Sequence, residues 1–216
     1  MREAGCFSIQ SGIESGSDAI LRNMRKGYTP AQIREGVARL REAGIQAHGM
    51  FIVGFPGETR ETVETTLSLI QETELDSAAF FTFELCDGTD ADVVVSKAAY
   101  GIEGSRLRWR HATMDSEEAL AMTRHCVDAV CMRMSRTCIG SEMTMSYLLI
   151  GGGLSLEEAG GYLQAVKDHY RAKKLEDPLL ERQAVGRILD YYSKMRQTLR
   201  DLKIPFDWPR PGDGDA

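Results

Sequence analysis

The stretch from Gly49 to Thr59 brings together residue types that can hold a small ligand at the end of a strand. Gly54 and Gly57 allow the backbone to turn tightly or to approach a ligand closely. Glu58 precedes Thr59, which can cap the next helix, and the start of a helix favours an anion. Ligands of α/β proteins bind where a strand passes through such a turn into a helix.

Two other interpretations of this turn can be weighed from its residues, of which one remains open and the other is excluded. The glycines can serve the geometry of a strand-to-helix turn alone, and that interpretation is at least as strong as ligand binding. A phosphate-gripping P-loop does not fit, because no Lys-Ser or Lys-Thr pair follows Gly57. Small and polar residues also follow an earlier strand-like stretch, at Glu14 to Ser17.

Stretches typical of strands alternate with stretches typical of helices over the first part of the chain. Cys6 to Ile13 alternates apolar and polar residues, Ile45 to Val53 is apolar and uncharged, and Ser77 to Leu85 is rich in phenylalanine. Helix starts with capping residues lie between them, at Thr29 to Gln32 and at Thr59. This order predicts parallel strands with helical crossovers, as part of a larger barrel or open sheet.

The remaining chain divides by composition into a connection, a helical region and a tail. Residues 1–90 hold the strand and helix units, and residues 91–114 are predicted to be an irregular connection. Capping residues and apolar stripes predict helices over 115–204. Residues 205–216 contain three prolines, two glycines and three aspartates, so we expect a disordered tail.

Charge and hydropathy argue against two classes of partner. The 216-residue chain has a net charge of −6 at pH 7, which gives no electrostatic reason to expect nucleic acid. Its best apolar run, Met143 to Ile150, is far shorter than the ~20 residues that span a bilayer. Met1 to Gln10 has no apolar core of a secretory signal, so we expect a cytoplasmic protein with reduced thiols.

Cysteine and histidine positions give no strong metal motif. The chain has five cysteines, Cys6, Cys86, Cys126, Cys131 and Cys138. An odd number of cysteines without a secretory signal argues against a disulfide framework, and no two of them have CxxC spacing. We interpret Cys126, Cys131 and Cys138, which are close in sequence, as small core residues, with a metal or cluster site as the weaker alternative. His48 and His111 are candidate acid-base groups, although a lone histidine is usually structural.

Three segments in order resemble the second half of radical S-adenosylmethionine (SAM) enzymes: Gly12 to Ser17, Met24 to Thr29 and Phe51 to Thr59. The likeness is greatest to the branch that contains a cobalamin domain, the group of anaerobic magnesium-protoporphyrin ester cyclases and radical methylases. Trp109 to Asp115 resembles the segment after the barrel in that branch. The resemblance covers roughly residues 1–120 and leaves the C-terminal helices unassigned.

The resemblance implies an α/β fold, the C-terminal half of a partial (β/α)6 TIM-like barrel with parallel strands, followed by a helical C-terminal region. In the family, a CxxxCxxC motif after the first strand holds a four-iron four-sulfur cluster that binds SAM. That motif is absent from this chain, whose strands correspond to the fourth, fifth and sixth. The cluster ligands and the N-terminal half of the barrel are therefore expected outside it, and Met1 is interpreted as an internal methionine of a longer protein.

The resemblance also assigns polar site residues. Glu14 and Ser15 would face the ribose and amino-acid part of SAM, and Lys26 would pair with its carboxylate, as a cation pairs with an anion. Each has a simpler alternative. Polar groups at a strand end can satisfy local backbone, and a lysine is often a solvated surface residue.

Apolar site residues follow from the same likeness. Ile52 and Gly54 would lie along the adenine, and Phe83 could stack near it, although all three are equally compatible with core packing. The sequence departs from the family after the sixth strand, where Cys86 to Thr89 replaces the usual Pro-Gly-Thr loop. No metal ligand is predicted in this chain.

The implied function is that of a radical SAM enzyme, with cobalamin as a further cofactor of the full-length protein if it belongs to that branch. Such an enzyme reduces SAM and takes a hydrogen atom from its substrate, here an unknown small molecule or peptide, and methyl transfer often follows in the cobalamin branch. Without the cysteine motif, this chain alone is expected to be inactive. Two alternatives stay open: a non-catalytic nucleotide-binding or interaction module built on a half barrel, and an unrelated α/β piece whose glycine turn holds a phosphate.

Overall fold

The structure is a computed structural model that describes residues 1–86, 99–140 and 149–201. The chain divides into two compact units, Met1–Glu142 and Met143–Ala216, which are described separately. The first unit begins with alternating strands and helices: β1 (Ser8–Glu14), α1 (Asp18–Asn23), α2 (Pro30–Glu42), β2 (Gln46–Val53), α3 (Arg60–Thr73) and β3 (Ser77–Thr82).

The predicted parallel sheet is confirmed. β1 pairs with β2, and β2 with β3, each in parallel. A fourth strand, β7 (Cys138–Ile139), adds in parallel beside β3. The sequence did not predict β7, because two residues are too short for an alternating pattern to be read.

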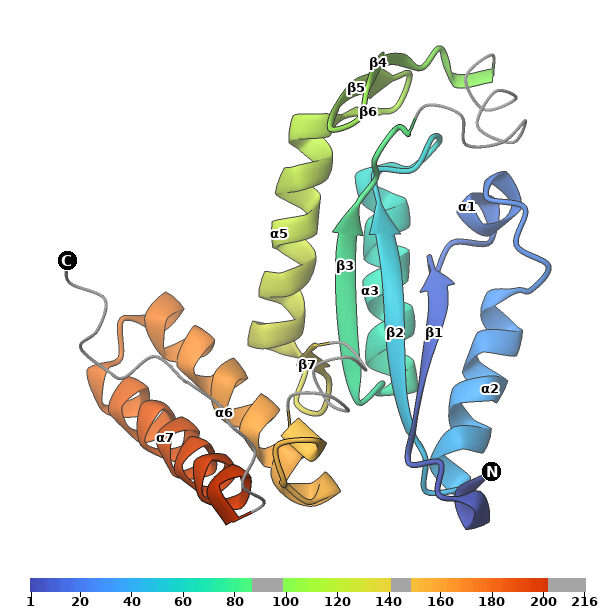
Figure 1. Ribbon diagram of the computed structural model, residues 1–216. Helices are drawn as coiled ribbons and strands as arrows, with labels where there is room; N and C mark the ends of the chain where they lie inside the picture. Colours follow the sequence, from blue (N-terminus) through green and yellow to red (C-terminus); the bar gives the residue numbers. More distant parts are fainter. Residues whose placement is uncertain (87–98, 141–148, 202–216) are drawn as a thin grey trace. The chain divides into compact units, whose positions relative to one another are not determined.

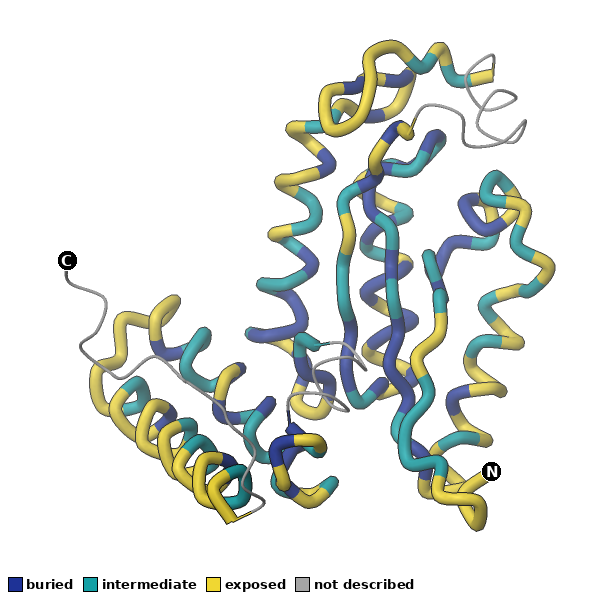
Figure 2. Tube along the Cα trace, in the orientation of Figure 1, coloured by how far each residue is buried: buried dark blue, intermediate teal, exposed yellow. Residues whose placement is uncertain are grey.

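Helices α2, α3 and α5 cover one face of this sheet. Figure 1 shows α3 behind β2 and β3, and Figure 2 shows buried residues along this helix and along both strands. Phe51, Val63 and Ile70 belong to the core between them and are at most 1% exposed. On the opposite face Met50 and Ile52 are only half-buried, and Phe81 is 51% exposed. Among the described residues of the first unit, helices therefore cover one face of this parallel sheet, although such sheets usually have both faces buried.

Capping residues begin the helices where the sequence predicted. Thr29 caps α2 in a capping box with Gln32, and Pro30 occupies the first helical position. Thr59 caps α3, accepting a hydrogen bond from the Thr62 amide. These local signals fix where each crossover helix starts and hence where each strand must end.

Residues 103–115 differ from the irregular connection that the sequence predicted. They form an antiparallel sheet of β4 (Glu103–Ser105), β5 (Arg108–His111) and β6 (Met114–Asp115). The strands have only two to four residues each, so the sequence pattern was too short to reveal them. The next helix, α5 (Ser116–Arg133), packs against β3 and lies in the first unit, although we expected it to open the helical C-terminal region.

The described part of the second unit is dominated by two long helices that contact each other, α6 (Leu156–Leu175) and α7 (Pro178–Asp201). Lys173 with Glu181 and Asp168 with Arg187 form ion pairs between them, at 2.6 and 2.8 Å. The predicted tail, and residues 91–98 of the predicted connection, lie outside the described residues. Among the residues that the structure describes, no helix is long and apolar enough to cross a membrane.

Gly16 provides a test of how β1 is joined to α3. A Cβ at Gly16 would lie 2.6 Å from the Thr66 Cα and 2.8 Å from the Thr65 carbonyl oxygen, both backbone atoms. We expect Gly16→Ala to lower the free energy of unfolding by about 1–3 kcal/mol, because the loop after β1 must move off the helix. Urea unfolding followed by circular dichroism measures this change.

Gly36, on the exposed side of α2, supplies the matched control. No atom lies within 4 Å of a Cβ built there. Gly36→Ala should raise the free energy of unfolding by about 0.5–1 kcal/mol, because alanine loses less conformational entropy in a helix. Equal effects of the two substitutions would contradict the close approach of β1 and α3.

Candidate functional site

Glu14 ends β1 in an unusual backbone conformation. The pairing of β1 with β2 shifts between Gly12 and Glu14, and Glu14 has a φ of 64°, in the left-handed region. A Cβ at Gly12 would lie 2.6 Å from the Glu14 Oε1, so the carboxylate folds back over that glycine. Bulges of this kind re-aim side chains, and non-glycine residues at positive φ cluster at functional sites.

Lys26 meets Glu14 at this strand end. Its Nζ donates a hydrogen bond to the Glu14 Oε1 at 2.9 Å, and the two side chains are 35% and 14% exposed. This bond to Glu14 raises the pKa of the Lys26 ammonium, so it stays charged at neutral pH. Two residues that the sequence assigned to one ligand are thus in direct contact, and neither is fully buried.

Ser15 has a different environment. Its side chain is fully buried, and its Oγ lies 3.2 Å from the Thr66 Oγ1 of α3. Because the Thr66 hydroxyl donates to the Thr62 carbonyl, Ser15 is the donor in this contact, and it accepts from the Ser17 amide at 3.1 Å. Its single O–H is therefore used within the fold by a distant partner, while the bond from the Ser17 amide is the local backbone role that the sequence left open.

The turn after β2 is closed by a buried carboxyl group. Glu58 is 1% exposed, and its Oε2 accepts a hydrogen bond from the Gly54 amide. The Phe55 amide also bonds to this carboxyl group. Burial raises the pKa of Glu58 to about 7, although the two amide donors act in the opposite direction. The amides that could have bound an anionic ligand are thus bonded to a residue of the same turn.

Both turn glycines adopt positive φ, 91° at Gly54 and 93° at Gly57, where side chains are strongly disfavoured. A Cβ at Gly54 would meet the Ala119 Cβ at 2.5 Å and the Trp109 ring at 2.9 Å. A Cβ at Gly57 would meet the Asn23 side chain at 2.5 Å. Each glycine therefore serves the turn geometry and a close approach by the protein itself.

The strand ends of β2 and β3 are covered by aromatic residues. Phe83 is 7% exposed and makes edge contacts with Phe55 and Trp109, at ring-centroid distances of 5.4 and 5.3 Å. Ile52 packs against the same cluster but remains half-buried on the open face of the sheet. Phe83 thus has a core environment, whereas Ile52 retains a surface that a ligand could reach.

Comparison with known proteins identifies the first part of the chain. Residues 1–70, which carry β1, β2 and most of α3, match the Radical SAM superfamily. These residues are a radical SAM segment. The resemblance to radical SAM enzymes, drawn from the glycine-rich strand ends, is thereby confirmed at the level of the superfamily.

Curated relatives support the same assignment. An uncharacterized methyltransferase, PH0819, of Pyrococcus horikoshii is 44% identical over 80 residues, which are 37% of this chain and 17% of that protein. The tRNA-2-methylthio-N(6)-dimethylallyladenosine synthase of Geobacter sulfurreducens is 51% identical over 69 residues, 31% of this chain and 16% of the relative. The corresponding synthase of Shewanella woodyi is 30% identical over 143 residues, 65% of this chain and 27% of the relative. The chain spans about a quarter or less of the length of these relatives.

One solved structure is similar over most of the chain. It is the radical SAM methyltransferase TsrM from Kitasatospora setae, with cobalamin and a [4Fe-4S] cluster bound. The match has a TM-score of 0.48 and 15% identity, and covers 92% of this chain and 41% of that chain.

Sequence reasoning missed the residues that hold the end of β2 in the radical SAM segment. It placed Glu58 at the start of a helix rather than under the Gly54 amide, and it set His111 aside. The His111 Nε2 lies 3.1 Å from the Gly54 carbonyl oxygen, while its Nδ1 accepts from the Thr113 amide at 3.3 Å. In β5, buried Trp109 and His111 alternate with exposed arginines, and this alternation was the sequence signal that could have revealed these two residues.

The other candidate groups are buried within the fold. His48 is 2% exposed, and its Nδ1 lies 2.5 Å from the Ser77 Oγ, which donates to the Gly140 carbonyl. Cys126, Cys131 and Cys138 are buried, as expected for core residues. In the described parts of the chain, no group of three or more His, Cys, Asp or Glu side chains could hold a metal ion.

The raised pKa of Glu58 predicts a specific pH dependence of stability. The native carboxyl keeps its proton up to about pH 7, whereas an unfolded glutamate loses it near pH ~4.3. The contribution of this group is therefore fully present below pH ~4.3 and is lost as the pH rises toward 7. At about 1.4 kcal/mol per pKa unit, the full loss is about 4 kcal/mol, of which a small part already occurs below pH 4.5.

The measurement compares wild type with Glu58→Gln, which cannot ionise, in urea unfolding between pH 4.5 and 8. The wild-type free energy of unfolding should fall relative to the variant by up to about 3 kcal/mol over this range. Glu61→Gln, an exposed glutamate in the first turn of α3, is the control and should follow wild type. A constant difference between wild type and Glu58→Gln would show that the carboxyl has no raised pKa.

Proposed function

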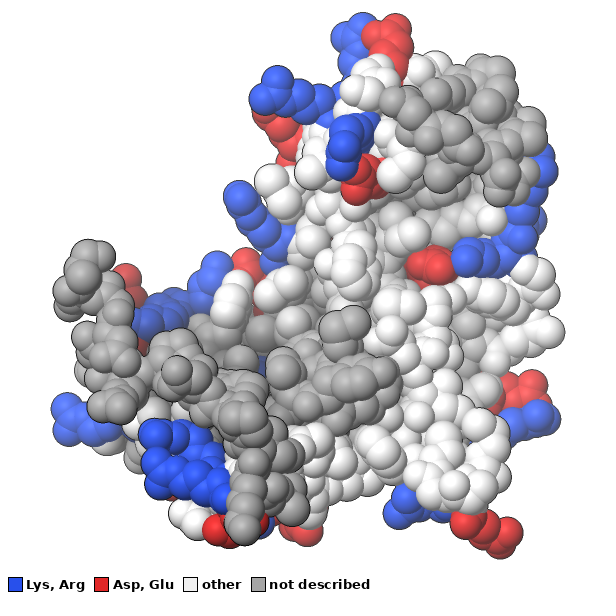
Figure 3. Space-filling model, in the orientation of Figure 1, with Lys and Arg blue, Asp and Glu red and all other residues white. Residues whose placement is uncertain are grey.

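We propose that this chain is the C-terminal part of a radical SAM enzyme, and that its β1–β3 strand ends form one wall of the SAM site. The observation that carries the proposal is the Glu14–Lys26 pair at the end of β1, beside a largely open sheet face. In Figure 3, most of the visible surface over β1 to β3 that is not grey is white, so it carries few charged side chains. An apolar wall with one ion pair at its rim suits a ligand with an aromatic base and a charged end.

SAM fits these residues as follows. Lys26 has three N–H donors, of which one bonds to Glu14, so its ammonium can also pair with the carboxylate of SAM. Glu14 is a hydrogen-bond acceptor suited to the ribose hydroxyls or the amino group. Ile52 offers an apolar surface to the adenine. Gly54 would contribute its backbone and Phe83 the shape of the site, because Trp109 already covers one side of each residue.

The iron–sulfur cluster of the family does not fit this chain. The sequence has no CxxxCxxC motif, and the described residues contain no metal-binding group of side chains. We infer that the cluster ligands belong to the N-terminal half of the barrel, outside these 216 residues. This chain alone would bind and orient SAM without performing the radical chemistry.

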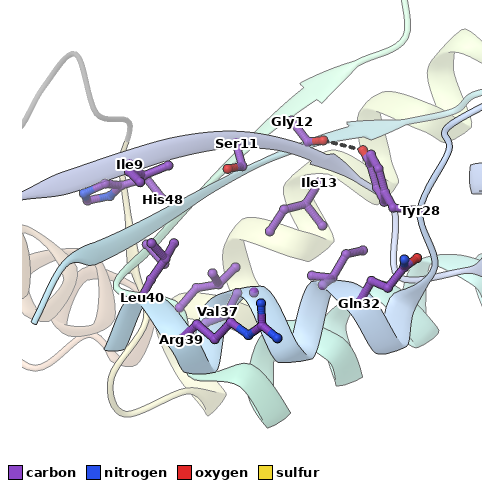
Figure 4. Close-up of a pocket in the computed structure, with 14 residues that line it drawn as sticks. Ile9, Ser11, Gly12, Ile13, Tyr28, Gln32, Val37, Arg39, Leu40 and His48 are labelled. Atoms are coloured by element: carbon purple, nitrogen blue, oxygen red, sulfur yellow. Dashed lines mark hydrogen bonds between the residues drawn. The ribbon is translucent and has the colours of Figure 1, made fainter. Parts of the chain in front are cut away.

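A cavity beside β1 supports the inference of a missing half barrel. It has a volume of about 490 Å³ and lies between β1 and α2. Figure 4 shows Ile13, Val37 and Leu40 pointing into it, and Tyr28 donating a hydrogen bond to the Gly12 carbonyl. In the described part of the chain, β1 is also an edge strand of its sheet. An edge strand beside an apolar hollow suits a further strand and helix of the barrel.

The reaction of the full-length enzyme is proposed from its relatives. Their names describe a methyltransferase and methylthio synthases, so we favour radical-based methylation or a related group transfer. Membership in the cobalamin branch, and with it a cobalamin cofactor, rests on the likeness of the Trp109–Asp115 segment. We place the protein in the cytoplasm, with a small molecule or a peptide rather than nucleic acid as its substrate.

The phosphate-binding alternative is weakened by the turn geometry. The Gly54 and Phe55 amides are already bonded to Glu58, and an ionised carboxylate there would repel a phosphate. The non-catalytic alternative, a nucleotide-binding or interaction module, differs from the proposal in whether SAM is preferred over other adenosine compounds.

A titration of the ¹⁵N-labelled chain with SAM tests the proposal. We expect amide chemical shifts to change at Glu14, Lys26 and Ile52, with millimolar or tighter affinity, because only part of the site is present. Adenosine should bind more weakly, since it lacks the carboxylate that pairs with Lys26. Stronger competition by inorganic phosphate than by adenosine would favour the phosphate-binding alternative, and equal binding of SAM and adenosine would favour the non-catalytic module.

Lys26→Ala is the variant that connects the affinity to the carboxylate. It should weaken SAM binding about tenfold, with little effect on adenosine, as expected for one charge-assisted hydrogen bond. Arg22→Ala is the matched control, because Arg22 is a nearby cation that pairs with Asp18 on the exposed side of α1. Equal losses in both variants would point to a general charge effect instead.

The missing cysteine motif predicts the outcome of cluster reconstitution. Anaerobic incubation of this chain with iron and sulfide should yield no [4Fe-4S] cluster with a site open to SAM, as measured by electron paramagnetic resonance after reduction. No cleavage product of SAM should form. A cluster whose spectrum changes on addition of SAM would refute the assignment of the ligands to another part of the protein.

A further inference from the structure

We propose that Trp109 and His111 of β5 act as a clamp that positions the carboxyl ends of β2 and β3 for the adenosyl group of SAM. The inference rests on the proposed function for the identity of the ligand. The clamp itself rests on two hydrogen bonds and one ring stack that do not depend on any ligand. The sequence had named His111 only as a candidate acid-base group and Trp109 only as part of a segment that resembles the family.

The two side chains donate to neighbouring strand ends. The Trp109 Nε1 donates to the Phe83 carbonyl at 2.9 Å, and the His111 Nε2 lies 3.1 Å from the Gly54 carbonyl oxygen. A carbonyl can only accept, so the His111 Nε2 carries the proton and donates it. Its Nδ1 is then the acceptor for the Thr113 amide, which fixes the neutral imidazole in this tautomer.

The rings hold these donors in a fixed spacing. Trp109 and His111 stack with an interplanar angle of 5° and a centroid distance of 5.1 Å. They are 4% and 8% exposed, so little water competes for their donors. Two donors fixed on one stacked pair therefore set the separation of the two carbonyls that they bind.

The clamp connects β2 and β3 beyond the point where backbone hydrogen bonds of the sheet pair the two strands. The paired residues of β2 and β3 end at Val53 and Thr82, and one further bond joins the Phe83 amide to the Val53 carbonyl at 2.7 Å. Beyond that point, Gly54 turns away at a positive φ. The clamp replaces the missing ladder bonds at Gly54 and Phe83, two of the three positions that the family resemblance assigned to the adenine.

The clamp acts on binding through other residues, so Trp109 and His111 are positioning residues rather than ligand contacts. Trp109 fills the space beside the Gly54 Cα, and its ring contacts the edge of Phe83. Loss of either donor should loosen the end of one strand while leaving the helix-side core of the sheet intact. The expected signature is local, which separates it from a general loss of stability.

The experiment measures amide hydrogen exchange by NMR in the whole chain. Trp109→Phe keeps an aromatic ring and removes the donor to Phe83, and His111→Phe keeps a flat ring and removes the donor to Gly54. We expect exchange at Gly54, Phe55 and Phe83 to rise roughly five- to tenfold, the factor that one net hydrogen bond contributes. His111→Gln, which restores an N–H donor at a similar position, should return the Gly54 and Phe55 rates toward wild type.

Val130→Ala is the control for general destabilisation, because Val130 is fully buried in the core between α5 and the sheet. It should raise exchange throughout the first unit without a preference for the strand ends. Exchange that rises uniformly in the Trp109 and His111 variants, or a His111→Gln variant no better than His111→Phe, would overturn the clamp.

SAM titrations of the same variants test the positioning role. Trp109→Phe and His111→Phe should weaken SAM binding about three- to tenfold, and His111→Gln less, in step with the exchange rates. Variants with faster local exchange that bind SAM as tightly as wild type would overturn the positioning role. If wild type itself does not bind SAM, the proposed function fails, while the exchange rates still decide whether the clamp exists.

Discussion

The backbone of Gly54 is held on both sides, and the shape of the candidate site depends on this constraint. Its amide donates to the buried Glu58 carboxyl, and its carbonyl accepts from His111. Gly54 lies beyond the last paired residue of β2, so these side chains supply the partners of its backbone. The cost of burying Glu58, visible in its raised pKa, is offset by a defined turn between β2 and α3.

The open face of the sheet connects this local geometry to function. Helices cover one face of β1 to β3, while Met50 and Ile52 on the other remain half-buried and Phe81 is 51% exposed. An isolated domain would gain stability by covering such a surface, whereas a wall of a larger binding site must leave it accessible. The Glu14–Lys26 pair at the rim of this face adds charge where a ligand with an amino-acid end would need it.

The candidate site was predictable from the sequence where a residue contacts its near neighbours in the chain. Glu14 and Lys26 were assigned to one ligand and are in contact. Ser15 was assigned to the same ligand, but its hydroxyl bonds to Thr66 on α3, a partner that local sequence does not reveal. Gly54 and Phe83 were expected along the adenine, and β5 covers them on one side with Trp109. Residues far along the chain supply that cover, so no local pattern could indicate it.

The sequence by itself determined the parallel strands, the capped starts of α2 and α3, and the membership of residues 1–70 in the radical SAM superfamily. These features follow from periodicity, capping chemistry and turn glycines, which act over a few residues. Only the tertiary structure decided that β4 to β6 form a sheet and that α5 belongs with the first unit. It also decided that the Gly54 amide bonds to Glu58 and the Gly54 carbonyl to His111. Those features depend on contacts between distant segments, because a buried polar group takes whichever partner the fold brings to it.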